Sequence, residues 1–430
     1  MSKFLFTMWP ANDLGLPSRL VPIARLLADR GHEVAMFNPA PAPANLIADA
    51  GLTNLPFPAP PVAPPVFDLR EIHLAWDAEA LLAPCYSDED FLKAMTAIYV
   101  KLIQDYAPDV VVDSFELFAC LAARIAKVPL VTVLQASFHP ASDGFYWWKP
   151  DRPQNLPSAA PVFNKVAASY GQPPRPRCID WLAGDCSLIV GTPETDPLPA
   201  NANIEYVGPL VWQRSSAALP DWINSLDSAK PVIWVYSGNP RYAAAATPLI
   251  GVQSPSTPAD SIVVIRTAIA ALADMPVHVV LTTGYQQLPP EVGALPANFH
   301  HAPYLPGIAM AQRSAVMVHH GGHGSSMTGL VAGTPAVIIP TISEREGNAR
   351  RVAATGAAEI VVPTESADGE KHVDAAEFRA KVERVLRDPA YRASAQRVAE
   401  SARKYEGART AADRIERFAN ESRSRQAGRS

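Results

Sequence analysis

Residues 315–349 read AVMVHHGGHGSSMTGLVAGTPAVIIPTISEREGNA, and this stretch decides the fold. Its apolar start, residues 315–318, is typical of a buried strand, and a glycine cluster follows directly. Two serines then predict the start of a helix that ends near Gly333. Free backbone N–H groups and the positive end of the helix dipole therefore meet at one turn, which favours a diphosphate. The turn contains Gly321, Gly322 and Gly324, followed by Ser325 and Ser326.

The side chains at this turn also suit phosphate oxygens. His320 can donate a hydrogen bond to one phosphate, while the Ser325 hydroxyl and the neighbouring amides bind the other. The alternative is a glycine-rich turn without a ligand, which a lone pair of glycines would favour. The histidine, the additional small residues and an asparagine at position 348 favour the ligand site.

Length and composition set the class of protein. The chain has 430 residues, of which 48% are hydrophobic, so it can bury two ordinary cores. Its formal net charge is −5. No basic stripe indicates nucleic acid, and no apolar run of about 18 residues indicates a membrane span. The N-terminus turns polar too early for a secretory signal, and the four cysteines lack metal-ligand spacing. We therefore expect a cytoplasmic protein.

Strand-like and helix-like segments alternate in both halves of the chain, which predicts an α/β fold. We predict two doubly wound parallel sheets with helices on both faces. The predicted domains are residues 1–212 and 228–405, and residues 406–430 form a helix that returns to the first domain, plus a mobile tail from residue 423. The predicted strands are 4–9, 34–37, 109–113, 129–134 and 187–191, then 232–236, 277–282, 315–318 and 336–339; the main predicted helices are 20–29, 115–127, 261–272 and the region from 374 onward.

Proline is unusually frequent, with 43 residues, and it is concentrated in residues 39–66 and 150–176. Hydrophobic residues are interleaved with these prolines. We therefore predict ordered but irregular loops in both stretches.

Several motifs together resemble the GT-B nucleotide-sugar glycosyltransferases. They are RGHEV at residues 30–34, WINSLDSAKPVIWVYSGN at 222–239, and the late HHGGHGS, AGTP and N-A elements. The resemblance covers roughly residues 3–400, and the chain looks like bacterial natural-product enzymes and family 1 UDP-glycosyltransferases. It implies two Rossmann-like domains that face each other across a cleft.

The resemblance implies that the second domain binds a UDP- or dTDP-sugar donor. It places a small-residue loop near the phosphates and the reacting sugar, and a segment of main chain beside the base. The implied donor residues are Ser237 and Gly238 at the phosphates, Tyr304 and Leu305 at the base, His320, Gly321, Gly322, Gly324 and Ser325 at the diphosphate, and Glu344 and Arg345 at the sugar.

Two donor positions depart from the family pattern. Where the family usually has Asp-Gln, this chain has Glu344 and Arg345, and a guanidinium prefers carboxylate or phosphate. One hypothesis is a negatively charged donor sugar such as a uronic acid; the alternative is that Arg345 pairs with Glu344 or Glu346 and orders the loop. Thr328 stands where a glutamate commonly binds the ribose, so ribose recognition must rest on other groups.

The expected catalytic base is also missing. Inverting members of the family usually have a histidine after the glycine of the first loop, where this chain has Leu16. Asp13 and Asp113 are the candidate replacements, since a carboxylate can take the proton of the acceptor. For both, the alternative is a helix or turn cap.

Acceptor binding is expected in the first domain. The aromatic residues Phe145, Trp147 and Trp148 would stack on a flat apolar acceptor, or they close the core under a proline-rich loop. His139 would line the same region and is a weaker candidate for the base.

The resemblance implies an inverting, metal-independent hexosyl transfer to a small, largely apolar acceptor, with the sugar nucleotide as co-substrate and no other cofactor. We expect a monomer or homodimer. Two alternatives remain: a non-catalytic partner or sensor that binds the sugar nucleotide, and a GT-B sugar-nucleotide epimerase.

Overall fold

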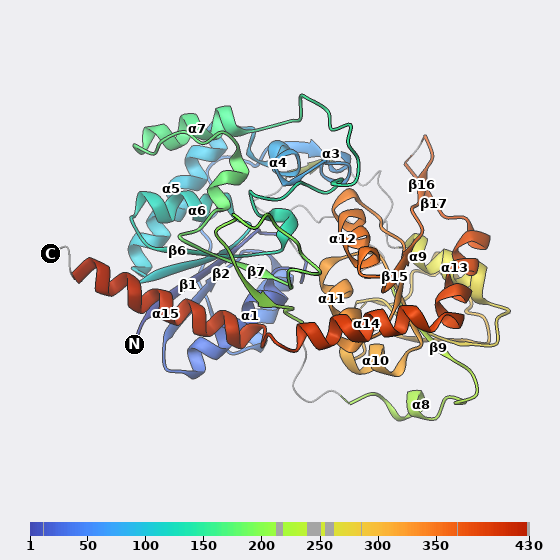
Figure 1. Cartoon of the computed structure of the whole chain (residues 1–430). Coiled ribbons are helices and arrows are strands. Elements are labelled where there is room, and N and C mark those ends of the chain that lie inside the picture. The colour runs from blue at the N-terminus through green and yellow to red at the C-terminus, as the bar shows by residue number, and fades with distance from the viewer. Residues whose placement is uncertain are drawn as a thin grey trace. The chain divides into compact units, whose positions relative to one another are not determined.

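The computed structural model describes residues 1–430 except 12, 212–217, 239–250, 254–261, 285, 368 and 428–430. Its internal contacts divide the chain into two units, drawn in Figure 1. Unit 1 takes in the chain up to Trp212, a short return that includes β10 (Gly251–Gln253), and the chain from Tyr405 onward. Unit 2 takes in most of the remainder, up to Lys404. The return through β10 had no counterpart among the predicted elements.

Unit 1 is built on a seven-stranded parallel sheet in the order β3-β2-β1-β5-β6-β7-β8. Its inner strands are continuous apolar runs because helices bury both faces. Thr7 and Asp113 are register partners on the neighbouring strands β1 and β5. The strands are β1 (Lys3–Met8), β2 (Glu33–Phe37), β3 (Thr53–Asn54), β5 (Val110–Ser114), β6 (Leu130–Leu134), β7 (Cys186–Val190) and β8 (Glu205–Gly208).

Helices cover the two faces of this sheet (Figure 1), and a hydrophobic cluster packs on each face. One face packs against α1 (Pro17–Asp29), α2 (Pro41–Asp49) and α15 (Ala408–Ala427). The other packs against α5 (Glu89–Tyr106), α6 (Leu117–Ile125) and α7 (Ala160–Ser169). The smaller elements are β4 (Val66–Asp68), which pairs with β10, α3 (Leu69–His73), α4 (Ala78–Leu82), η1 (Ala83–Tyr86), η2 (Ala136–Phe138) and η3 (Cys178–Leu182).

The C-terminal helix α15 lies against α1 within unit 1. Arg30, just after α1, forms ion pairs with Asp413 at 2.5 Å and Glu416 at 3.0 Å. Arg423 donates a hydrogen bond to the Met1 carbonyl at 3.1 Å. The segment expected to be a mobile tail is therefore helical as far as Ala427.

Unit 2 is built on a six-stranded parallel sheet in the order β12-β11-β9-β13-β14-β15. The strands are β9 (Val232–Tyr236), β11 (His278–Thr282), β12 (Phe299–Ala302), β13 (Val316–His319), β14 (Ala336–Ile338) and β15 (Ala358–Ile360). The other elements are α8 (Asp221–Asn224), α9 (Ile262–Leu272), η4 (Pro290–Val292), α10 (Gly307–Arg313), α11 (His323–Ala332), α12 (Ser343–Ala354), the hairpin strands β16 (Thr364–Glu365) and β17 (Lys371–His372), α13 (Ala375–Arg387) and α14 (Pro389–Ala402).

The prediction of two doubly wound parallel sheets is confirmed. The prediction of irregular loops in the proline-rich stretches is wrong in part. Residues 39–66 contain α2 and β3, and residues 150–176 contain α7. Both helices carry proline in their first turn, where its missing N–H group is not needed for a helical hydrogen bond.

Both sheets share one topological feature that positions ligands. In unit 1, β2 and β3 lie on one side of β1, and the later strands, starting with β5, lie on its other side. In unit 2, β11 and β12 lie on one side of β9, and the later strands, starting with β13, lie on its other side. Ligands of such sheets bind at the carboxyl ends of the strands where this switch occurs. The switch points lie between β1 and β5 in unit 1 and between β9 and β13 in unit 2.

Candidate functional site

The glycine turn of residues 320–324 lies at the switch point of unit 2. Helix α11 begins at His323, two residues before the predicted start. Gly321 has a φ of +87°, and a Cβ there would lie 2.8 Å from the Arg345 carbonyl oxygen. A Cβ on Gly324 would meet no atom within 4 Å. The turn is thus tightly packed behind Gly321 and open in front of the first turn of α11, as a phosphate-binding turn requires.

His320 lies across the switch point from the residues that follow β9. Gly238 has a φ of +72°, and a Cβ there would lie 2.9 Å from Cε1 of His320. Gly322 is equally restricted, since a Cβ added there would lie 2.7 Å from Nε2 of the His320 ring. Only glycine at both positions leaves room for the imidazole. The sequence prediction that Gly238 and His320 share one site therefore agrees with their positions, although their ligand stays a prediction.

The His320 ring is neutral at neutral pH. Its pKa lies well below 6.5, first because the ring is buried and second because the positive charge of Arg345 is nearby. Its Nδ1 atom is buried and has no hydrogen-bond partner among the described residues. A neutral imidazole with a buried, unpaired nitrogen can hydrogen-bond to a ligand without adding a charge to the site.

Hydroxyl groups surround the same turn. Ser237 is fully buried and donates to the Gly238 carbonyl oxygen at 3.0 Å. Ser325 is 8% exposed in the first turn of α11, where the free N–H groups lie. Thr328 donates to the Gly324 carbonyl at 2.9 Å, so its hydroxyl is engaged by its own helix.

Neighbouring histidines serve the turn itself. His319 is fully buried, and its Nδ1 accepts a hydrogen bond from the Gly321 N–H at 3.1 Å. Burial lowers its pKa to about 3, so this ring is also neutral. Within the described parts of the chain, no group of three histidine, cysteine or acidic residues has a metal-binding arrangement.

Tyr304 and Leu305 follow β12, on the far side of β9 from β13. The Leu305 side chain is 5% exposed and packs in a cluster with Trp234 and Met310. This packing fixes the main chain between β12 and α10. The contact of that main chain with a nucleotide base stays a prediction.

Glu344 and Arg345 lie in the first turn of α12, beside the glycine turn. Asn348 connects the two turns, since its amide donates to the Gly321 carbonyl at 3.1 Å and to Glu344 at 2.7 Å. The Arg345 guanidinium donates to the Thr341 hydroxyl. The Glu344 carboxylate is therefore held by Asn348 in the first turn of α12.

Asp113 lies at the carboxyl end of β5, at the switch point of unit 1. It is fully buried and accepts hydrogen bonds from the Thr7 hydroxyl at 2.7 Å, the Glu116 N–H at 3.0 Å and the Cys120 thiol at 3.3 Å. Burial outweighs these bonds and raises its pKa to about 7. Asp113 thus binds the backbone N–H of Glu116, the residue that caps α6, and does not cap the helix itself.

A second acid lies beside Asp113. Glu116 is fully buried, forms the N-cap of α6 and accepts hydrogen bonds from the Phe118 N–H at 3.1 Å and the Tyr86 hydroxyl at 3.0 Å. Burial, together with the negative charge of Asp113, raises its pKa to about 8. The sequence analysis did not single out this residue, although an acid three residues after Asp113 was a visible signal.

Asp13 lies in the loop between β1 and α1, at the same end of the parallel strands as Asp113. Its Oδ1 accepts a hydrogen bond from the Gly15 N–H at 2.7 Å, so it caps this turn. Unlike Asp113, it is only partly buried. Leu16 is the N-cap of α1 and makes no side-chain cap. Asp13 is therefore the more accessible of the two candidate carboxylates.

The predicted acceptor residues divide between core and surface. Phe145 is fully buried and belongs to the core of unit 1, whereas Trp147 is 43% exposed. The Trp148 ring makes edge-to-face contacts with two other rings, with ring centroids 5.5 Å from Tyr146 and 5.8 Å from Trp147. The core alternative thus describes Phe145, and the two tryptophans remain candidates for stacking.

His139 is buried in a loop after β6. Its Nδ1 accepts a hydrogen bond from the Ala141 N–H at 3.1 Å, and burial lowers its pKa to about 4. Because Nδ1 already accepts a hydrogen bond, the proton of the neutral ring lies on Nε2. His139 in this state is a donor, which weakens its case as a base.

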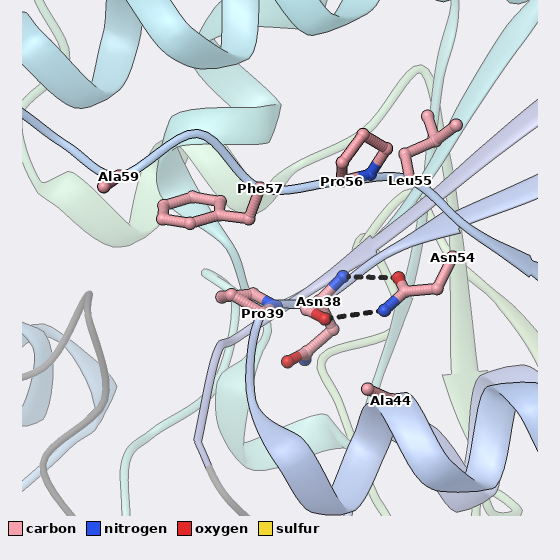
Figure 2. Close-up of a pocket in the computed structure, with 8 residues that line it drawn as sticks. All are labelled: Asn38, Pro39, Ala44, Asn54, Leu55, Pro56, Phe57 and Ala59. Carbon is pink, nitrogen blue, oxygen red and sulfur yellow. Dashed lines mark hydrogen bonds between the residues drawn. The ribbon is translucent and has the colours of Figure 1, made fainter.

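A cavity of about 430 Å³ lies where β2 and β3 end, and the sequence analysis did not predict it (Figure 2). Two hydrogen bonds join Asn38 and Asn54, from the Asn38 N–H at 3.1 Å and from the Asn54 amide at 2.9 Å. These bonds occupy polar groups, so the lining is mainly apolar. Its lining residues are Asn38, Pro39, Ala44, Asn54, Leu55, Pro56, Phe57 and Ala59.

Comparison with known proteins supports the resemblance. Residues 266–410 match the family described as erythromycin biosynthesis protein CIII-like, C-terminal domain. The PGL/p-HBAD biosynthesis glycosyltransferase of Mycobacterium tuberculosis is 27% identical over 377 residues, which are 81% of this chain and 78% of that protein. The 10-deoxymethynolide desosaminyltransferase of Streptomyces venezuelae is 25% identical over 420 residues, 89% of each chain.

Solved structures share the fold. The glycosyltransferase VinC, solved in complex with dTDP, has a TM-score of 0.69 and 22% identity, with 97% of this chain and 100% of that chain covered. The spinosyn forosaminyltransferase SpnP has a TM-score of 0.67 and 19% identity, with 97% and 99% covered. No helix among the described residues is both long and apolar enough to cross a membrane. In sequence and in fold, the chain is similar to the GT-B glycosyltransferases that act in bacterial natural-product biosynthesis.

Proposed function

We propose that this protein transfers a sugar from a nucleoside diphosphate sugar to a small, largely apolar acceptor, with inversion at the anomeric carbon. The observation that carries the proposal is the open turn at the N-terminus of α11. There, the neutral His320 directly precedes the glycine turn, Gly324 is exposed, and the first N–H groups of the helix have no side-chain cap. This arrangement favours an anion with several oxygens.

The donor diphosphate would lie on this turn. The N–H groups of the first turn of α11 and the Ser325 hydroxyl bind phosphate oxygens, and His320 donates one further hydrogen bond. Glu344, held by Asn348, accepts hydrogen bonds from sugar hydroxyls. The main chain at Tyr304 and Leu305 lies against the base. These donor contacts need no metal ion.

The acceptor would bind in unit 1, with Asp13 as the general base. An acceptor hydroxyl attacks the anomeric carbon from the side opposite the phosphate, its proton passes to the Asp13 carboxylate, and the nucleoside diphosphate leaves with the bonding electrons. Asp13 is favoured over Asp113 because it is more accessible, whereas Asp113 is fully buried and already accepts three hydrogen bonds. Trp147 and Trp148 would stack on the apolar body of the acceptor.

The relatives support this class of acceptor by their names. One is named for transfer of desosamine to 10-deoxymethynolide, and another acts in PGL/p-HBAD biosynthesis. We propose an acceptor of the same broad class for this chain.

The test incubates the full-length protein with a panel of dTDP- and UDP-sugars and a library of hydroxylated apolar compounds, with products identified by mass spectrometry. Asp13→Asn should lower turnover by about 100-fold or more, the usual contribution of a general base. Donor affinity, measured by calorimetry, should stay within about twofold because Asn keeps the hydrogen bond to Gly15. Asp29→Asn, a surface change at the end of α1, is the matched control and should retain full turnover.

Two results would overturn the proposal. Donor binding with neither transfer nor hydrolysis, across the whole acceptor library, would indicate a sensor that has lost the reaction. A donor recovered as its isomer would indicate an epimerase.

A further inference from the structure

The cavity at the ends of β2 and β3 lies within unit 1 and has an uncharged lining. Figure 2 shows it between α2, which carries Ala44, and the chain from Leu55 to Ala59. Among the described residues, eight line the cavity, and none of the eight has a charged side chain. Its volume of about 430 Å³ lies in the range of sites that bind small molecules. A charged ligand would lose hydration there without gaining a counter-charge, so the lining favours an uncharged one.

The polar groups at the base of the cavity are engaged by the protein itself. The Asn54 side chain accepts a hydrogen bond from the Asn38 N–H at 3.1 Å and donates one to the Asn38 carbonyl at 2.9 Å (Figure 2). The Asn38 side-chain oxygen accepts from the Ala40 N–H at 2.9 Å. Beside them, the Leu55 N–H donates to the Met36 carbonyl at 2.8 Å. The surface left for a ligand is therefore mainly apolar.

The walls of the cavity are rigid. Pro39 lies between β2 and α2, Pro56 follows β3, and both rings fix the backbone φ at their positions. The Phe57 ring packs against Phe37, with ring centroids 5.5 Å apart, and Phe37 is fully buried. A pre-formed cavity costs little ordering of side chains when a ligand binds.

Hydrogen bonds connect the cavity to the strand end that leads to Asp13. The Asn38 side-chain amide donates to the carbonyl of Trp9, the residue after β1, at 3.4 Å. The Trp9 N–H in turn donates to the Ser114 carbonyl, at the end of β5, at 3.1 Å. Asp13 lies in the loop that continues from Trp9. Strands β1, β2 and β3 are neighbours, and the spacing of about 5 Å between strands places the cavity within roughly 10 Å of the end of β1.

Building on the proposed acceptor site in unit 1, we infer that this cavity binds an uncharged, apolar part of the acceptor that is remote from the reacting hydroxyl. The hydroxyl lies at Asp13, while the remote ring or chain fills the space between α2 and the segment after β3. Binding energy from the remote part then holds the hydroxyl in position for transfer. Acceptors without this part should bind more weakly and also react more slowly.

The binding experiment uses N-phenyl-1-naphthylamine, an uncharged fluorescent compound, and the full-length protein. Ala44→Leu places a larger side chain in the cavity and should weaken the affinity by about tenfold or more, because it displaces several atoms of the ligand. Ala48→Leu, one turn further along α2, is the matched control; Ala48 is exposed and outside the lining, so the affinity should stay unchanged. Ala59→Trp obstructs the cavity from an exposed position, so its effect does not depend on repacking of the core.

The charge of the ligand is tested with 8-anilinonaphthalene-1-sulfonate, an anionic analogue of the same compound. It should bind more weakly, because its sulfonate finds no cation in the lining. Tighter binding of the anion would overturn the inference of an uncharged ligand. Equal affinity of the wild type, Ala44→Leu and Ala59→Trp for N-phenyl-1-naphthylamine would overturn the cavity as its site.

Turnover then connects the cavity to the acceptor. With an acceptor identified from the library, N-phenyl-1-naphthylamine should raise the KM of the acceptor, and so should Ala44→Leu. Donor affinity should stay unchanged in both cases. An acceptor KM that neither the saturating compound nor Ala44→Leu changes would overturn the inference while the proposed function stands. If no donor and acceptor pair supports transfer, the proposed function fails, whatever the fluorescent compound shows.

Discussion

The buried carboxyl group of Asp113 should make unit 1 less stable as the pH rises, and Asp113→Asn should remove much of this dependence. In the fold the group has no exposed surface, and its pKa is raised from 3.8 to about 7 by burial. In the unfolded chain it regains its ordinary pKa. Between about pH 4 and pH 7 the folded group therefore holds a proton that the unfolded group has released.

The sign and size follow from this difference. Unfolding releases one proton from Asp113 in that window, so each added pH unit favours unfolding tenfold. The stabilising contribution is fully present below about pH 4, is lost progressively up to about pH 7, and changes no further above it. A shift of about three units corresponds to about 4 kcal/mol for this group. Glu116, whose pKa is about 8, extends the loss toward higher pH.

Asp113→Asn has two opposite effects on the free energy of unfolding. Asparagine can accept the hydrogen bond from Thr7, but its NH₂ group cannot accept from the Glu116 N–H, and leaving that buried N–H without a partner costs about 1–3 kcal/mol. It also removes the ionisable group, and with it the repulsion that raises the pKa of Glu116. Asp113→Asn should therefore be less stable than the wild type near pH 5 and should gain on it as the pH rises to 8.

The assay must report on unit 1 alone, because two units need not unfold together. Samples equilibrated in urea at pH 5, 6, 7 and 8 receive a short deuterium pulse at one common pH. Mass spectrometry of the peptide that contains β5 then gives the unfolded fraction. Asp29→Asn is the control, since Asp29 is a surface group whose pKa is lowered by its hydrogen bond to Arg25; that variant should keep the loss of stability toward high pH.

The reasoning is refuted if the wild type and Asp113→Asn show parallel stability curves from pH 5 to pH 8. Parallel curves would mean that Asp113 is ionised in the fold across this range. In that case a carboxylate stabilised at the end of β5 would again be a candidate for the base.

Two further predictions concern the turn and the aromatic cluster. Gly324→Ala should keep or slightly raise the melting temperature of unit 2, because alanine favours a helix. It should weaken dTDP or UDP binding by about tenfold, because the new methyl group fills the open space. Equal binding by the variant and the wild type would place the diphosphate elsewhere. Phe145→Ala should destabilise unit 1 by about 3–5 kcal/mol, as for other buried phenylalanines, in a urea titration. Trp147→Ala should leave stability within about 0.5 kcal/mol and raise the KM of the acceptor, whereas an unchanged KM would remove Trp147 from the acceptor site.

Several elements of unit 2 could be predicted closely from the sequence. Strand β9 occupies the predicted residues, and α11 ends at Ala332 with Gly333 in the left-handed conformation, as the sequence indicated. These features are local, since apolar runs, glycines and a helix end lie within a few residues of one another. Topology then brings Gly238 and His320 together, which the sequence implied only through the family resemblance.

Features that depend on distant contacts could not be predicted in the same way. The burial of Asp113 and Glu116 follows from the packing of α5 and α6 over the sheet, and no local pattern encodes it. Helix α2 was missed because prolines in its first turn look like loop residues, although the first turn is where a helix accepts them. The pairing of β10 with β4 joins segments about 180 residues apart, beyond any periodicity.

The two switch points have the same topology but carry different polar and charged groups. In unit 2, neutral histidines lie at the start of α11, whose N-cap makes no side-chain hydrogen bond, and these free N–H groups favour an anion. In unit 1, the corresponding place holds carboxyl groups, and a bound diphosphate there would be repelled by Asp13. This difference supports the proposed donor site in unit 2 and the proposed acceptor site in unit 1. Because the sheets are alike, the division of labour rests on the residues at the strand ends, and substitutions there should alter one half of the reaction at a time.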